Sequence, residues 1–260
     1  MLNSFLNLLL SPVILVPLAI YIGVRVRRIK KYKSSTYYQI TKEPYSSIRK
    51  NLGKRGEFLT YEKLRKYEED GAKFLFNIYI PKENGETSEV DVLMITSKGI
   101  FVFESKNYSG WIFGNDKQRN WCQTLPTGKG KSRKEYFYNP VLQNRSHIKH
   151  LRALVGDKYP MHSIIVFSER CTLKSIELES DDVKVIKRDR VANVVADIYK
   201  NVTEDVLTKD EVLQLFDQLF QYTQISEAVK VKHIANIQSQ LAEQNSDAPT
   251  ITKEDLRIED

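Results

Sequence analysis

The chain has 260 residues, of which 41% are hydrophobic and 28% are charged. That apolar share excludes a disordered chain, and the length favours one principal domain with appendages. The formal charge is +7, yet six of the 40 Lys and Arg residues lie between Arg25 and Lys33, which leaves 34 basic against 33 acidic residues elsewhere. The basic balance therefore does not by itself indicate a nucleic-acid-binding protein.

Residues 5–24 carry no charged side chain and lead directly into the basic cluster. At about 1.5 Å per residue they span roughly 30 Å, the thickness of the hydrocarbon core of a bilayer. A cleaved signal peptide is the alternative, but the segment has no charged start and no small-residue cleavage site. We predict that residues 1–33 form a single-pass transmembrane anchor with a basic flank. The positive-inside rule then places the rest of the chain in the cytoplasm, at the cell membrane.

Residues 34–47 are polar with little periodicity and are predicted to be a spacer. Residues 48–200 are predicted to be an α/β domain, because amphipathic and alternating segments follow one another there. Helices are predicted at 54–67, 140–155 and 190–200, and strands at 73–80, 88–96, 100–106, 162–168 and 183–187. This order predicts a mixed sheet with helices on its faces.

The remainder of the chain is predicted to be a helical extension over 201–243 and a flexible tail over 244–260. The extension carries an apolar stripe at helical spacing, formed by Val212, Leu215, Phe216, Leu219 and Phe220. Such a stripe is usually core or a helix-packing seam, and a protein partner or self-association is the alternative.

The strongest chemical signal lies in the strands at 88–96 and 100–106. Asp91 interrupts an apolar run, and Glu104, Ser105 and Lys106 end the next one. A two-residue loop at Ser97 and Lys98 sets Asp91 directly opposite Glu104, whereas a three-residue loop shifts the register by one place. Two facing carboxylates destabilise a sheet unless a cation lies between them.

We therefore predict that Asp91, Glu104 and the carbonyl of Ser105 hold Mg²⁺ or Mn²⁺, which prefer oxygen ligands. Lys106 would orient or help to deprotonate the attacking water and offset charge on the phosphate. Glu57 lies on the apolar face of its helix and is predicted to be a further metal ligand. An ion pair between Glu104 and Lys106 without catalysis is the alternative.

A basic loop is predicted over residues 114–135, flanked by aromatic residues such as Trp111, Trp121 and Tyr136. Basic side chains contact phosphates and exposed aromatics stack on bases, although a solvated loop with its aromatics in the core fits as well. The predicted nucleic-acid-binding residues are Lys117, Arg119, Lys129, Lys131, Arg133 and Lys134. The pair His147 and His150 is assigned no role, since no cysteine pair supports a zinc site.

Five motifs together resemble the nuclease-related domain called NERD, a branch of the PD-(D/E)xK restriction-endonuclease-like superfamily. They are Gly53-Lys54-Arg55-Gly56-Glu57, Glu89-Val90-Asp91-Val92, Phe103-Glu104-Ser105-Lys106-Asn107-Tyr108-Ser109-Gly110, Trp121-x-Gln123 and Asn139-Pro140-x-x-Gln143. The resemblance covers roughly residues 48–170 and implies a restriction-endonuclease-like fold.

The resemblance also implies roles for individual residues. Glu57, Asp91, Glu104 and Lys106 match the acidic, metal-binding and lysine positions of the superfamily, and Gln143 matches its polar residue on the following helix. Val90 stands where the superfamily's name has a proline. The predicted function is a membrane-anchored, metal-dependent nuclease acting on DNA, with RNA as a further possible substrate. The alternative is a non-catalytic module that binds nucleic acid or protein at the membrane.

Overall fold

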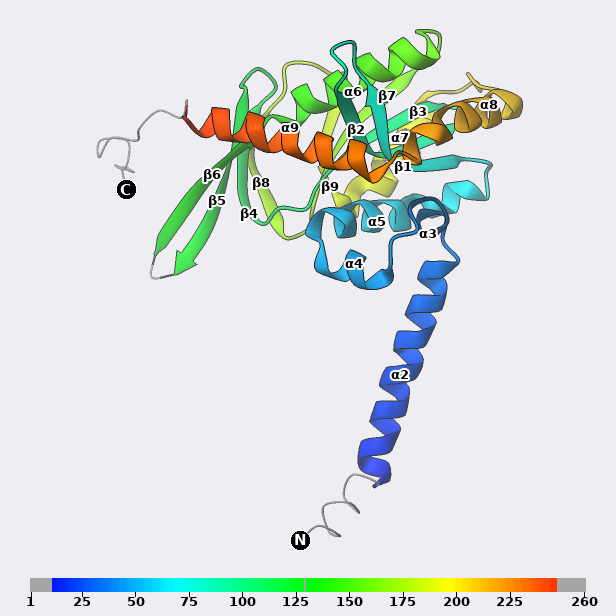
Figure 1. Ribbon diagram of the computed structural model, residues 1–260, viewed down its shortest axis with the longest axis vertical. Helices are drawn as coiled ribbons and strands as arrows, with labels where there is room; N and C mark the ends of the chain where they lie inside the picture. The colour runs from blue at the N-terminus through cyan, green and yellow to red at the C-terminus, as the bar shows by residue number, and fades with distance from the viewer. Residues whose placement is uncertain (1–10, 129, 247–260) are drawn as a thin grey trace.

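The computed structural model describes residues 11–128 and 130–246, which form two β-sheets with helices around them (Figure 1). The larger sheet has the order β1-β2-β3-β7-β9, and the smaller has the order β6-β5-β4-β8. In the larger sheet β1 (Lys73–Pro81), β2 (Thr87–Thr96) and β3 (Gly99–Lys106) run antiparallel. The strands β7 (Met161–Phe167) and β9 (Val183–Lys187) continue it in parallel with β3. The predicted mixed α/β class is thus confirmed.

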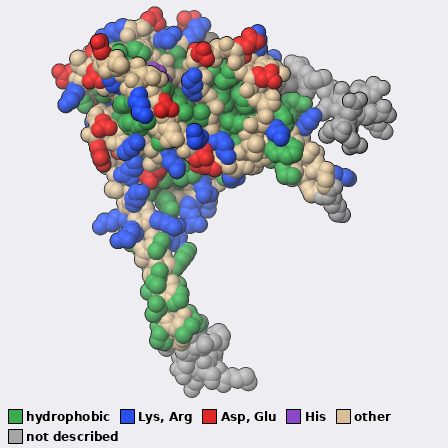
Figure 2. Space-filling view, turned by 180° about the vertical axis from the view of Figure 1, so that it is seen from behind, with side chains coloured by type: hydrophobic (Ala, Val, Ile, Leu, Met, Phe, Trp, Pro, Cys, Tyr) green, Lys and Arg blue, Asp and Glu red, His purple; other side chains and the backbone are tan. Residues whose placement is uncertain are grey.

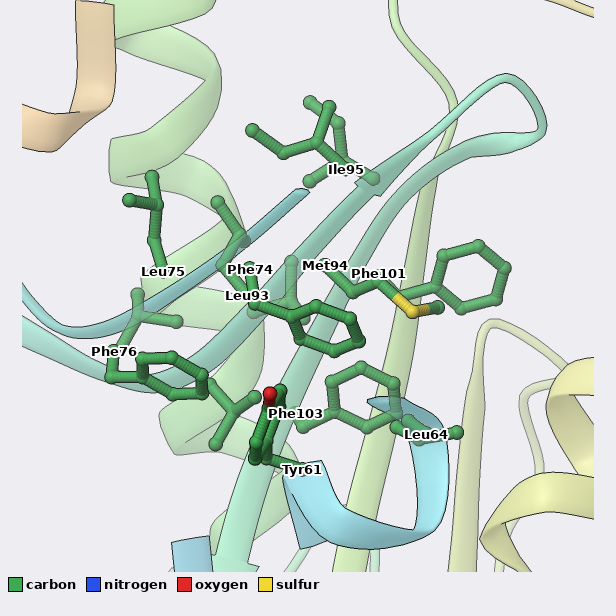
Figure 3. Packing of buried hydrophobic residues seen from close by; sticks show 14 of the residues in the cluster. Tyr61, Leu64, Phe74, Leu75, Phe76, Leu93, Met94, Ile95, Phe101 and Phe103 are labelled. Carbon is green, nitrogen blue, oxygen red and sulfur yellow. The ribbon is translucent and has the colours of Figure 1, made fainter. Parts of the chain in front are cut away.

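Helices cover both faces of the larger sheet (Figure 1). On one face, α5 (Leu52–Leu64) packs beside α7 (Val191–Asn201), and α6 (Pro140–Val155) packs on the other. Tyr61 of α5 lies against Phe74 and Phe76 of β1, with ring centroids 5.2 and 5.3 Å apart (Figure 3). Aromatic rings bury a large apolar area, so this layer holds α5 firmly on the sheet.

The predicted spacer over residues 34–47 is wrong, because the segment folds into the domain. It forms α3 (Thr36–Thr41) and enters α4 (Tyr45–Lys50), and it buries Tyr37 and Ile40. The ring centroid of Tyr37 lies 4.7 Å from that of Phe76 on β1. The segment lacks helical periodicity because each helix is too short to repeat an apolar face, and tertiary packing stabilises them instead.

The helix α2 (Pro12–Lys33) projects from the domain as a stalk (Figure 1). Its apolar side chains are exposed, and Lys and Arg side chains gather where it meets the domain (Figure 2). Residues 5–10 of the predicted transmembrane segment lie outside the described residues. Among the helices of residues 11–128 and 130–246, none is both long and apolar enough to cross a membrane. The predicted transmembrane helix is therefore not supported by this part of the structure.

The predicted basic loop over residues 114–135 is also wrong, because most of it belongs to the smaller sheet. That sheet contains β4 (Gly110–Asn115), β5 (Asn120–Gly128), β6 (Lys131–Tyr138) and β8 (Cys171–Glu177). The hairpin of β5 and β6 extends away from the domain (Figure 1). The two strands of this hairpin cannot be recognised from the sequence, because their charged, exposed residues show no alternation of apolar and polar side chains.

The C-terminal helices pack on the same domain. In α8 (Lys209–Phe220), the stripe residues Val212, Leu215 and Leu219 are buried in the main core. The stripe is thus core, as one of the two interpretations expected. The helix α9 (Glu227–Ser246) contacts β2 through His233, whose Nδ1 lies 2.9 Å from Thr87 Oγ1. Of the predicted flexible tail, residues 244–246 belong to α9 and 247–260 lie outside the described residues.

Replacing Tyr37 by alanine tests whether the segment before α5 belongs to the core. We expect Tyr37→Ala to lower the free energy of unfolding by about 3–5 kcal/mol, the usual cost of deleting a buried aromatic side chain. Leu213→Ala is the matched control, because Leu213 is 46% exposed on α8 and should change stability little. Chemical denaturation followed by circular dichroism measures both. Equal stability of Tyr37→Ala and the wild type would contradict the packing described above.

Candidate active site

The register of β2 and β3 brings Asp91 and Glu104 together. Val92 pairs with Phe103 and Thr96 pairs with Gly99, so Ser97 and Lys98 form a two-residue loop. This register sets Asp91 opposite Glu104, one residue beyond the Val92–Phe103 pair. Gly99 takes a φ of 118°, a conformation that glycine adopts readily.

Asp91 is held at the end of the strand pair by a backbone hydrogen bond. The amide of Ser105 donates to Asp91 Oδ2 at 2.8 Å. Burial, and then the negative charges of Glu104 and Glu57, raise the pKa of Asp91 well above its ordinary range. The carboxylates of Asp91, Glu104 and Glu57 therefore repel one another where the β2–β3 ladder ends, and a cation bound there would relieve this repulsion.

Glu104 is almost fully buried and has a cationic or polar partner on each oxygen. Lys106 Nζ lies 2.7 Å from Oε1, and His147 Nε2 lies 3.1 Å from Oε2. Burial acts to raise the pKa of Glu104, but Lys106 and His147 outweigh it and lower that pKa to about 2. Glu104 is thus ionised at neutral pH, which suits a metal ligand and an ion-pair partner equally.

Lys106 reaches from β3 to α6. Its Nζ donates to Gln143 Oε1 at 2.9 Å while it pairs with Glu104. Burial acts to lower the pKa of Lys106, but the charges of Glu104, Tyr108 and Asp91 outweigh it and raise that pKa. The side chain is therefore a fixed positive charge. Gln143 lies where the sequence expects it, because Asn139 caps α6 through Val141 and Pro140 occupies its first turn.

His147 is the site residue that sequence reasoning missed. It is buried on α6, and its Nδ1 lies 2.6 Å from Ser88 Oγ while Nε2 faces Glu104. The two contacts fix the ring between β2 and β3. Its signal in the sequence is the spacing from Gln143, since residues four apart on a helix share a face. His150, the other member of the pair, has no such contact with Glu104 in the described part of the chain.

Glu57 reaches the site from α5, on the other side of the sheet. Its position depends on Gly56, where an added Cβ would lie 2.8 Å from Ser105 Oγ. Tyr37 Oη and Asn77 Nδ2 each lie 3.1 Å from Glu57 Oε2. Burial is the largest influence on the pKa of Glu57 and raises it to about 7.

Asn77 donates a hydrogen bond to the Glu57 oxygen that Tyr37 also contacts. It takes a φ of 49° and leaves the ladder between the Phe76–Val92 and Ile78–Val90 pairs. Its Nδ2 also lies 3.3 Å from Glu89 Oε1. Within residues 11–128 and 130–246, no three His, Cys, Asp or Glu side chains are grouped so as to hold a metal ion. The predicted four-ligand arrangement with Glu57 is therefore not formed in this structure.

The remaining donors still fit a hard cation. Asp91 and Glu104 offer carboxylate oxygens, the kind of ligand that Mg²⁺ and Mn²⁺ prefer. Ser105 Oγ is buried without a hydrogen-bond partner among the described residues, but it points to the opposite face of β3, toward Gly56 of α5, and is not a ligand beside these carboxylates. Binding would require Glu104 to share an oxygen that now faces Lys106 or His147.

Of the predicted nucleic-acid-binding residues, Lys131, Arg133 and Lys134 belong to β6 of the smaller sheet, and Lys117 and Arg119 lie in the connection between β4 and β5. Lys129 lies outside the described residues. Two of the described residues are paired, since Lys117 contacts Glu179 at 2.6 Å and Arg133 contacts Glu135 at 2.5 Å. The five described cations thus belong to the smaller sheet or to the connection between two of its strands, and none of them is paired with Glu104.

Comparison with known proteins supports the resemblance seen in the motifs. Residues 52–168 match the family described as the nuclease-related domain, and this stretch contains Glu57, Asp91, Glu104, Lys106 and Gln143. An uncharacterized protein of Bacillus anthracis is 29% identical over 192 residues, which cover 74% of this chain and 86% of the relative. No solved structure matches the chain.

Proposed function

We propose that this chain, whose residues 52–168 match the family described as the nuclease-related domain, is a metal-dependent nuclease that hydrolyses phosphodiester bonds in DNA. The observation that carries the proposal is the convergence of Asp91, Glu104 and Lys106 where the β2–β3 ladder ends. Converging acids beside a fixed cation are the groups that phosphodiester hydrolysis requires.

Each residue would have a separate task. Asp91, Glu104 and the Ser105 carbonyl would hold Mg²⁺ or Mn²⁺, which when bound activates water and neutralises charge on the phosphate. Lys106 would stabilise the negative charge that develops on the phosphate oxygens, because it stays protonated beside Glu104. Gln143 would fix the ammonium of Lys106, and His147 would fix the carboxylate of Glu104.

Glu57 would serve as a further ligand only after a local rearrangement. Its carboxylate accepts hydrogen bonds from Tyr37 and Asn77, and these would have to be released. Because burial raises its pKa to about 7, an approaching cation would also favour its ionised form. Metal binding and substrate binding would thus complete a site that is partly assembled.

The smaller sheet would bind the nucleic acid. Pairing sets Trp111 beside Thr124 and Thr124 beside Lys134, while Phe113, Cys122 and Tyr136 form the next row on the same face. Trp111 and Tyr136 are 52% and 55% exposed, so their rings can stack on bases. Lys134 lies in the same face and would contact the phosphates. Trp121 is buried in the core and takes no part.

We also propose that the N-terminal segment holds the chain at the cell membrane, with the domain in the cytoplasm. The support is the exposed apolar surface of α2, where Val16 and Ile20 are 55% and 61% exposed. Burying such residues in lipid is favourable, and the Lys and Arg residues at the end of α2 suit the cytoplasmic surface.

A non-catalytic nucleic-acid-binding module is the second candidate function. The observation that favours it is the closed network around Glu104, whose two oxygens already face Lys106 and His147. Such a network is satisfied without any metal ion. Under this alternative the smaller sheet would bind DNA or RNA, and Glu104 would serve stability alone.

Asp91→Asn distinguishes the two functions, because it removes a charge with almost no change of shape. We expect wild-type cleavage of linear, circular or single-stranded DNA or of RNA in Mg²⁺ or Mn²⁺, and a loss of about a hundredfold or more in the variant. Addition of EDTA should have the same effect. Asp205→Asn is the control, because Asp205 is 66% exposed near Lys98 and should leave the rate unchanged. If the folded wild-type protein cleaves none of these substrates, the nuclease proposal is wrong and the binding function remains.

The contribution of β6 is measured by the variant Lys134→Gln. Each lysine that contacts a phosphate adds about one to the slope of log affinity against log salt, so we expect the slope for an oligonucleotide to fall by about one. Lys200→Gln removes the same charge from an exposed helical position and should not change the slope. Fluorescence anisotropy over a salt series gives the slopes. If the slope of the variant equals that of the wild type, β6 does not contact the phosphates and the nucleic acid binds elsewhere on the protein.

Charged residues on α2 test the membrane proposal. In the full chain, Val16→Asp with Ile20→Asp should release the protein from the membrane fraction after an alkaline wash, because each Asp costs about 2.5–3.5 kcal/mol at the centre of a membrane helix. Val206→Asp with Leu213→Asp replaces two other exposed apolar residues and should leave the protein in the pellet. Recovery of the wild type in the supernatant would overturn the proposal.

A further inference from the structure

A cavity of about 560 Å³ opens where the stalk helix α2 meets α4 and α5. Four arginines line it: Arg25 and Arg28 from α2, Arg49 from α4 and Arg55 from α5. No residue of the Asp91, Glu104 and Lys106 cluster lines it, so the cavity is separate from the candidate active site. Its size is that of an ordinary small-molecule site.

The charge of this cavity is uncompensated. No Asp or Glu lines it, and none of its arginines forms an ion pair within the part of the chain that the structure describes. Like charges that converge from three helices repel one another unless an anion lies between them. The planar guanidinium group matches phosphate oxygens with two parallel hydrogen bonds, so a phosphate is the anion that four arginines would hold best.

The rest of the lining is apolar. Val24 of α2, Ile48 of α4 and Phe58 of α5 face the same space as the arginines. From Val24 the apolar surface continues along the stalk, where Val13 is 80% exposed (Figure 2). The ligand that matches both features has a phosphate at one end and a hydrocarbon chain at the other.

We propose that this cavity binds the headgroup of an anionic phospholipid, whose phosphate contacts the four arginines and whose acyl chains lie along α2. A hydrated phosphate ion or a nucleic-acid backbone would satisfy the arginines but would leave the apolar lining and the stalk uncovered. The lipid buries both. The cavity would then set the orientation of the domain on a membrane surface, because the ligand contacts α2, α4 and α5 together.

The test uses the full chain in nonionic detergent micelles and isothermal titration calorimetry. The titrants are dihexanoyl-phosphatidylglycerol, dihexanoyl-phosphatidylcholine, inorganic phosphate and a short single-stranded DNA. The variant is Arg49→Gln with Arg55→Gln, which leaves α2 unchanged. The matched control is Lys50→Gln with Lys63→Gln, since these exposed lysines lie on the same two helices outside the cavity. Thermal unfolding by circular dichroism verifies that both variants fold.

We expect the anionic lipid to bind more tightly than the other three titrants. Its affinity should fall about thirtyfold in the arginine variant, and less than about twofold in the lysine control. Equal binding of the two lipids, or an equal loss in the lysine control, would overturn the proposal. Inorganic phosphate or DNA that binds as tightly as the lipid and is lost in the arginine variant would also overturn it, and would reassign the cavity to that ligand.

Discussion

The buried ion pair between Glu104 and Lys106 is the interaction on which the arrangement of the site depends. Both side chains leave the end of β3 on the face covered by α6, where Gln143 and His147 take up their remaining hydrogen-bonding groups. Two buried charges repay their desolvation only when the geometry is good and further hydrogen bonds are made. The position of α6 on the sheet is therefore coupled to the charges of Glu104 and Lys106, and removing either charge would leave the other buried without its counter-charge.

Two further acidic side chains are buried near this pair, although a stable core does not require buried acids. Asp91 has a pKa well above its ordinary range, and that of Glu57 is raised to about 7, because both are buried near other carboxylates. Buried groups with displaced pKa values cluster at functional sites more often than elsewhere. The Glu104 carboxylate differs from these two because it forms an ion pair with Lys106, which helps to lower its pKa. The contrast between one carboxylate with a lowered pKa and two with raised pKa values is the electrostatic basis for expecting a cation there.

The proposed activities lie in three separate parts of the molecule. Chemistry would occur where the β2–β3 ladder ends, nucleic acid would lie on the exposed face of the smaller sheet, and lipid would contact the stalk and its neighbouring helices. The helix α5 connects two of these parts, since it carries both Glu57 and the cavity residue Arg55. Gly56 between them allows the helix to approach Ser105 closely. A shift of α5 would thus change both places at once.

The parts of the protein that depend on neighbours along the chain could be predicted from the sequence. The strands of the β2–β3 hairpin follow from alternation, and α6 follows from an Asn cap and a proline in its first turn. Two loop lengths fit the sequence of the hairpin, and the structure has the shorter one, which sets Asp91 opposite Glu104. Gln143 was joined to these residues only through the family resemblance. Local periodicity is strong for these elements because each buries one face of a long, regular segment.

The contacts between segments that lie far apart in the chain could not be predicted and are seen only in the folded structure. Tyr37, read as part of a spacer, packs on Phe76 and binds Glu57, while His147 is oriented by Ser88 of a distant strand. The β5–β6 hairpin is built by pairing of exposed, charged residues that carry no periodic signal. Asn77 leaves the β1–β2 ladder with a φ of 49° and donates a hydrogen bond to Glu57. Such features arise from long-range burial and pairing, whose energies are not encoded in any single window of the sequence.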